Sequence, residues 1–144
     1  MDLMPILLAV LLAFDQSSLK TAPADLEGVW NAVSMEGNGK PMPAQLAEGV
    51  VFTFKGEKLV LRGLGGNTVE QECTVAIDTT ATPKRLDFTP VGSARTVYAI
   101  YEIGGEKRDE LKIAFVRGGA ADSRPSTFTT TVGSNGLLFV LKKQ

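Results

Sequence analysis

Two carboxylates and one thiol come closest to a catalytic set in this sequence: Asp87, Glu102 and Cys73. A pair of carboxylates can divide the work of general acid and general base, as glycoside hydrolysis requires. Asp87 and Glu102 fall in two short alternating segments that can also turn them to solvent. We therefore favour solvated carboxylates over an acid–base pair.

Cys73 stands between Gln71 and Val75 on the apolar side of its segment, where a thiol acts as a small hydrophobic group. The adjacent Glu70 and Glu72 disfavour a thiolate, and the chain contains no histidine that could activate it. Without histidine the chain also lacks the commonest general base and metal ligand. A single cysteine excludes a disulfide framework and a multi-thiolate metal site. We expect no catalytic residue, no metal and no cofactor.

The charge of the chain gives no sign of a nucleic-acid partner. There are 15 basic and 16 acidic side chains, a formal net charge of −1. Binding to a phosphate backbone requires a basic surface, on which aromatic residues alternate when the strand is single. The sequence has no such pattern, so we expect no nucleic-acid binding.

The elements that must position these residues are strands, because apolar residues recur with a period of two from Leu26 onward. Glycine, proline and asparagine interrupt the pattern at the positions of turns. No window has a sustained period of 3.6 residues, so no substantial helix is expected. Eight or nine short antiparallel strands form an all-β barrel or sandwich, and a barrel leaves no open edges. The expected strands are 29–36, 50–55, 58–62, 68–78, 85–89, 96–103, 110–116, 127–131 and 137–142.

The N-terminal segment is typical of a secretory leader. Residues 5–14 form an unbroken apolar run, shorter than the roughly 20 residues of a membrane-spanning helix and within the range of a signal-peptide core. Ala22-Pro23-Ala24 offers a small-x-small cleavage site. We predict a signal peptide over 1–24 and a barrel domain over 25–144, exported to the periplasm or outside the cell, with no stable membrane span after cleavage. The alternative is a retained segment packed on a cytoplasmic domain.

The first expected strand opens with Gly28-Val29-Trp30, a Gly-x-Trp pattern, and further ordered blocks follow it. These blocks are Gly39-Lys40-Pro41, Ile100-Tyr101-Glu102-Ile103, Leu111-Lys112-Ile113-Ala114-Phe115, Arg124-Pro125 with Phe128, and Leu138-Phe139-Val140-Leu141-Lys142. The Gly-x-Trp pattern is similar to the signature of lipocalin-like barrels, and the blocks together resemble an uncharacterised lipocalin-like domain family abundant in planctomycete bacteria. The resemblance covers essentially all of 25–144 and implies a small exported eight-stranded (or nine-stranded) antiparallel barrel.

The resemblance implies a structural plug at one end of the barrel. In lipocalin-like barrels the tryptophan closes one end and an arginine commonly lies over its ring, a cation–π contact. This assigns the plug to Gly28, Trp30 and Arg124, with Lys142 as the second candidate for the cation. The alternative role for Trp30 is a wall on which a ligand stacks.

The barrel interior remains as the place for a function. A barrel of about eight strands is either filled by side chains or just wide enough for one small ligand. We predict a non-catalytic exported barrel that binds a small hydrophobic molecule, with Tyr98, Tyr101, Phe88 and Phe115 as its ligand-binding residues. The alternative is a filled-core module for protein interaction or cell-envelope association, without a small-molecule ligand. Both faces of 97–103 are apolar, so the strand is either covered on its outer side or part of a contact surface.

Overall fold

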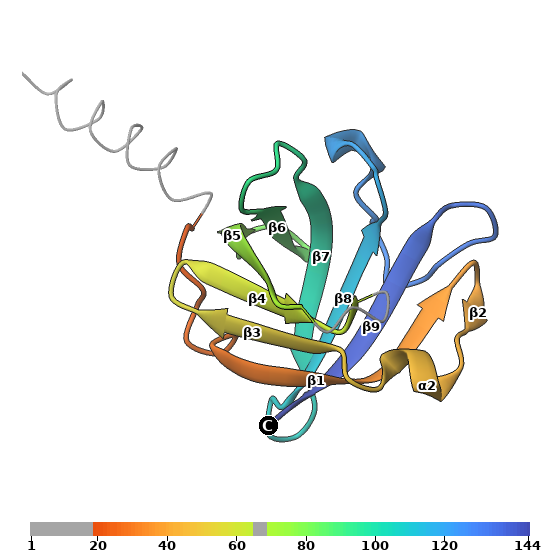
Figure 1. The fold of residues 1–144 in the computed structure, drawn as a ribbon, viewed down its shortest axis with the longest axis horizontal. Helices are drawn as coiled ribbons and strands as arrows, with labels where there is room; N and C mark the ends of the chain where they lie inside the picture. Colours follow the sequence, from red (N-terminus) through yellow and green to blue (C-terminus); the bar gives the residue numbers. More distant parts are fainter. Residues whose placement is uncertain (1–18, 65–68) are drawn as a thin grey trace, which may run out of the picture.

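Nine strands run through the residues that the computed structural model describes, 19–64 and 69–144 (Figure 1). Two short helical turns, α2 (Ala44–Ala47) and η2 (Ala121–Ser123), lie in the connections. The strands are β1 (Gly28–Gly37), β2 (Lys40–Pro41), β3 (Val51–Lys55), β4 (Lys58–Arg62), β5 (Gln71–Asp78), β6 (Lys84–Pro90), β7 (Val97–Gly104), β8 (Glu110–Val116) and β9 (Gly136–Lys143).

Eight of these strands close into an antiparallel barrel, which confirms the predicted lipocalin-like fold class. Consecutive strands from β3 to β9 are neighbours, and β1 lies between β3 and β9. The closing ladder runs from Trp30 opposite Lys143 to Gly37 opposite Leu137. The short β2 pairs only with the end of β1 and is the ninth strand. Closure gives each barrel strand two partners, so no long edge stays open to pair with another chain.

A β-bulge in β1 breaks the predicted alternation. The register with β9 shifts between Ala32 and Ser34, and the extra residue, Val33, is 52% exposed. A period of two counted from Trp30 places Ser34 on the inner face, but beyond the bulge Met35 packs against the core instead. A bulge bends a strand and increases its twist. β1 pairs with β3 from Gly28 to Asn31 and with β9 from Trp30 to Gly37, so the bend falls where the pairing with β3 ends.

The interior is filled by side chains along most of its length. Four phenylalanine rings are in contact from one wall to the other: the ring centroids of Phe52 and Phe139 are 5.5 Å apart, those of Phe139 and Phe115 5.8 Å, and those of Phe115 and Phe88 5.9 Å. Such spacings are those of packed aromatic pairs. The large side chains that are almost fully buried are Trp30, Tyr101, Phe52, Phe54, Phe139, Leu26, Leu59, Ile77, Leu86, Ile100, Leu111 and Ile113.

The connection between β8 and β9 covers the outer face of the sheet, and this explains why both faces of β7 are apolar. Ile100 points away from the core cluster yet is 1% exposed, as is Ala114, its partner on β8. Pro125 and its neighbours lie over them. The predicted strand at 127–131 is wrong. The barrel has already used the ladders of β7, β8 and β9, so this segment packs by side chains instead of joining the sheet.

Residues 19–24, which the sequence assigns to the leader, contact the barrel. Leu19 and Ile77 exchange two backbone hydrogen bonds of 2.6 and 2.7 Å, and the Ala22 amide donates to the Gly56 carbonyl at 2.9 Å. The predicted apolar run, 5–14, lies outside the described residues. Within 19–64 and 69–144, no helix is long and apolar enough to cross a membrane.

Candidate functional site: the mouth of the barrel

Trp30 closes one end of the barrel, and its indole N–H is paired. Its indole Nε1 donates a hydrogen bond of 2.9 Å to the Leu26 carbonyl, and the side chain is 0% exposed. The Lys143 ammonium lies 5.3 Å from the centre of the indole ring. Gly28 makes room for that lysine, because a Cβ at this position would lie 3.0 Å from Lys143 Cε.

The cation over Trp30 is therefore Lys143, and the assignment to Arg124 is wrong. Lys143 stands directly opposite Trp30 in the β1–β9 ladder, so the two side chains share a face. Arg124 lies in the loop outside the sheet, over the Tyr98 ring at 5.3 Å. Lys142, the second candidate, forms an ion pair with Glu110 at 3.6 Å.

The four predicted ligand-binding residues do not form one site. Phe88 and Phe115 meet edge to face inside the barrel. Tyr101 is also interior but lies toward the plugged end, where burial, followed by the charges of Asp25 and Asp78, raises its pKa to about 12. Tyr98 is on the outer face under Arg124, so its assignment to the interior is wrong. Phe128, which belongs to one of the blocks that carry the family resemblance, is outside the core cluster.

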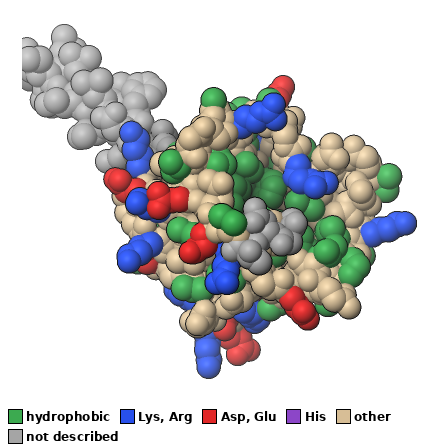
Figure 2. Space-filling model, viewed as in Figure 1, with side chains coloured by type: hydrophobic (Ala, Val, Ile, Leu, Met, Phe, Trp, Pro, Cys, Tyr) green, Lys and Arg blue, Asp and Glu red, His purple; other side chains and the backbone are tan. Residues whose placement is uncertain are grey.

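The end opposite Trp30 carries an apolar cavity of about 370 Å³, and we call this end the mouth. Figure 2 shows hydrophobic side chains in a hollow on the corresponding side of the molecule. The lining comes from six places in the chain: the far half of β1, the β2–α2 connection, α2, the residues just after β4, the end of β8 with the residue after it, and the start of β9. The lining residues are Met35, Met42, Leu46, Leu64, Phe115, Arg117 and Leu137.

The wall formed by 42–46 is held in place by its own backbone. The Met42 amide donates to the Met35 carbonyl at 2.9 Å, which continues the β1–β2 pairing. The next turn, α2, is anchored by Ala47, which is 2% exposed, and this anchoring leaves Leu46 at the cavity with 49% of its surface exposed. Figure 1 shows α2 and β2 beside the end of β1.

The side chains at the mouth offer hydrocarbon contact and one positive charge. Methionine and leucine side chains offer flexible, polarisable hydrocarbon contact. Phe115 joins the cavity to the packed aromatic rings below it. Arg117 is the charged residue of the lining; it is exposed and forms no ion pair within the described residues. The set suits a molecule with a hydrocarbon body and an anionic end.

The carboxylates and the thiol that the sequence offers for catalysis, Asp87, Glu102 and Cys73, do not form a catalytic set. Asp87 accepts a hydrogen bond from Arg124 on the outer face. Glu102 is exposed and lies opposite Lys112 on β8. Tyr98, the β7 residue opposite Asp87, is four residues from Glu102, which is about 13 Å at the rise of a strand. Asp87 and Glu102 therefore do not form a pair. Burial, followed by the charge of Glu72, raises the pKa of the Cys73 thiol to about 11. No cluster of metal-ligating side chains occurs in the described part of the chain.

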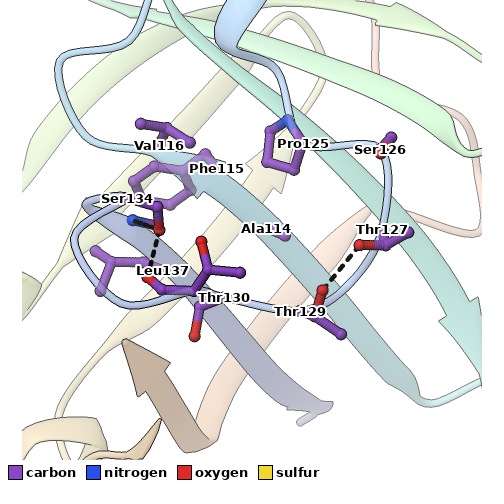
Figure 3. Close-up of a pocket in the computed structure, with 12 residues that line it drawn as sticks. Ala114, Phe115, Val116, Pro125, Ser126, Thr127, Thr129, Thr130, Ser134 and Leu137 are labelled. Carbon is purple, nitrogen blue, oxygen red and sulfur yellow. Dashed lines mark hydrogen bonds between the residues drawn. The ribbon is translucent and has the colours of Figure 1, made fainter. Parts of the chain in front are cut away.

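A smaller groove under the 125–136 loop reflects packing of that loop. Figure 3 shows Pro125 above Ala114, and the hydroxyl groups of Thr127 and Thr129 bonded to each other at 2.8 Å. Ser134 donates its hydroxyl to the Thr131 carbonyl at 2.7 Å. The groove holds about 170 Å³, below the roughly 300 Å³ at which ligand pockets begin.

Comparison of the whole chain with known protein families, with curated proteins and with solved structures gave no match. Function is therefore inferred from the geometry of the mouth.

Proposed function

We propose that this protein is a non-catalytic binding module that takes the hydrocarbon part of a small amphipathic molecule into the mouth of its barrel. The observation that carries the proposal is the apolar cavity of about 370 Å³ between β1, α2 and β9. Its volume falls in the range of small-molecule sites, roughly 300–1,000 Å³. Removal of hydrocarbon surface from water supplies the affinity, about 25 cal/mol for each Å² buried.

Arg117 indicates which polar group the proposed ligand carries. A guanidinium pairs with carboxylate, sulfonate or phosphate groups through parallel hydrogen bonds. Because Arg117 is exposed at the rim, the anionic end of the ligand stays in contact with water while the hydrocarbon end is buried. We therefore expect an anionic amphiphile of modest length, since the phenylalanine contacts below Phe115 leave the hydrocarbon chain only the mouth to occupy.

Export of the domain is part of the proposal. It is supported by the apolar run at 5–14 and by Ala22-Pro23-Ala24 after it. The resemblance to exported lipocalin-like domains supports the same location. Outside the cytoplasm, such a module would sequester or carry its ligand without altering it.

A fluorescence displacement experiment tests the binding proposal. Anilinonaphthalene sulfonate combines an apolar ring system with an anionic group, so it should bind at the mouth and be displaced by decanoate. The variant Leu46→Asp places a charge in the cavity and should abolish binding of both molecules. Val33→Asp is the matched control, because Val33 is 52% exposed, against 49% for Leu46, and does not line the cavity. Equal binding by both variants would contradict the proposal.

The second candidate function is protein interaction, and exposed apolar side chains at the mouth end favour it. Leu46, Val69, Val91 and Val132 are 49–82% exposed on or beside the connections at this end. The packed interior is also what a module without a small-molecule ligand requires. The displacement experiment separates the two functions, since a protein-interaction module predicts no saturable, competitive binding of decanoate.

A further inference from the structure

A second pocket, which the mouth does not explain, lies on the outer wall of the barrel. It occupies about 330 Å³ between the β5–β6 connection and the loop that follows η2. Two arginines and two hydroxyl groups line it together with a few apolar side chains, and no acidic side chain does. The lining residues are Thr82, Pro83, Arg85, Ile100, Ala121, Arg124, Pro125 and Ser126.

Arg124 is fixed in this pocket by three contacts. One terminal nitrogen, Nη1, donates to Asp87 Oδ1 and to the Ala99 carbonyl, and the guanidinium plane lies over the Tyr98 ring. The side chain is 14% exposed. Its Nε and Nη2 donors have no partner within 19–64 and 69–144. The Nε and Nη2 side of the Arg124 guanidinium is therefore held in position and can donate to a further acceptor.

Arg85 supplies the second positive charge. It stands directly opposite Ile100 in the β6–β7 ladder, so both side chains are on the outer face, and both line the pocket together with Arg124. Arg85 is exposed and forms no ion pair in the described part of the chain. Directly opposite Arg85 on β5 lies Asp78, which accepts two hydrogen bonds from Thr80. These bonds lower the pKa of Asp78, and the Arg85 charge adds a smaller effect in the same direction.

We propose that this pocket binds the oxyanion of a small carboxylate- or phosphate-bearing molecule. The open edge of Arg124 and the guanidinium of Arg85 converge on one volume, and Ser126 and Thr82 add hydroxyl donors. Charge-assisted hydrogen bonds from guanidinium groups are about twice as strong as neutral ones and recognise planar or tetrahedral oxyanions. The site is separate from the mouth, so the oxyanion proposal does not depend on the proposed function.

NMR titration of the full chain tests the oxyanion site. Inorganic phosphate and acetate are added separately, with sodium chloride at the same ionic strength as the reference. Saturable shifts of the amide resonances of Arg85, Ile100 and Ser126 with either anion support the site, and the anion that acts identifies its chemistry. Shifts no larger than those with chloride would overturn it.

Two variants control for charge alone. Arg85→Gln should weaken the apparent affinity about tenfold or more, the usual effect of losing one charge-assisted contact. Arg62→Gln removes the same charge from an exposed position on β4 that does not line the pocket, and should change the affinity less than twofold. Equal weakening by both would show a general charge effect and overturn the site. Leu46→Asp, which blocks the mouth, should leave this titration unchanged.

Discussion

At the scale of single residues, the plugged end depends on one glycine. Gly28 has a φ of +124°, in the region that side chains rarely adopt, and it lies against the lysine that covers Trp30. The Gly-x-Trp pattern is therefore explained by backbone geometry and close approach together.

Gly28→Ala should destabilise the fold by about 1–3 kcal/mol, from backbone strain and displacement of Lys143. Gly104→Ala is the control, because Gly104 has a negative φ and a Cβ there would meet nothing within 4 Å. Urea unfolding followed by fluorescence of Trp30, the only tryptophan, measures both. Equal stability of the two variants would contradict this explanation of the plug.

Two buried acids should make the protein sensitive to alkali. Burial raises the pKa of Cys73 from 9.0 to about 11 and that of Tyr101 from 10.0 to about 12. The folded state holds both protons more tightly than the unfolded state, so this contribution is intact below pH 9 and is lost as the pH rises to about 12. It amounts to a few kcal/mol in all.

The free energy of unfolding, measured by urea titration, should therefore fall from about pH 9 upward, where the thiol of an unfolded chain ionises. Tyr101→Phe should flatten the upper part of the decline, and Cys73→Ala the lower part. A decline of the same shape in both variants and in the parent would show that other groups cause it.

At the scale of elements, the period of two was sufficient to find all eight barrel strands, because each has one buried face. It failed where backbone geometry or the surroundings override the pattern. The bulge at Val33 changes which residues face inward, and nothing in the local sequence marks it. The threonine-rich segment 127–131 has strand composition, but no ladder was left for it to join.

The mouth was only partly predictable for a related reason. The sequence identifies Phe115 because the large apolar residues of its strand, Leu111, Ile113 and Phe115, recur with a period of two. Met42 and Leu46 were missed because they lie in a proline-broken connection whose place over the barrel is set by closure. Tyr98 was assigned to the wrong face because its strand is apolar on both, and only the covering loop explains why.

The segment preceding β1 should contribute to stability. A chain beginning at Asp25 lacks three hydrogen bonds to the barrel that a chain beginning at Leu19 has, two with Ile77 and one from Ala22 to Gly56. It also lacks the local bonds from Leu26 and Glu27 to the Pro23 carbonyl, and the burial of Ala22. At about 0.5–1.5 kcal/mol for each of the three bonds to the barrel, the shorter chain should be less stable by about 1.5–4.5 kcal/mol.

Hydrogen exchange locates that loss, since the Ile77 amide donates to Leu19 and should exchange faster in the shorter chain. Equal stability and equal exchange would show that 19–24 are dispensable to the fold, as the predicted cleavage after Ala24 requires. A measured loss would favour a mature chain that retains this segment.

At the scale of the whole molecule, packing divides the barrel into two parts with different roles. From Trp30 to the phenylalanine contacts the interior is filled, and this part supplies stability. Beyond Phe115 the strands diverge around a cavity whose walls are methionine, leucine and one arginine. The oxyanion pocket lies outside both parts, on the wall that the 117–135 connection covers.

The most direct test of ligand binding at the mouth is methionine-methyl NMR with decanoate. The chain has four methionines, of which Met35 and Met42 line the cavity, and Met→Leu variants assign their resonances. We predict saturable shifts of the Met35 and Met42 methyl resonances, abolished by Leu46→Asp and retained in Val33→Asp. Unchanged Met35 and Met42 resonances at saturating decanoate would contradict ligand binding at the mouth.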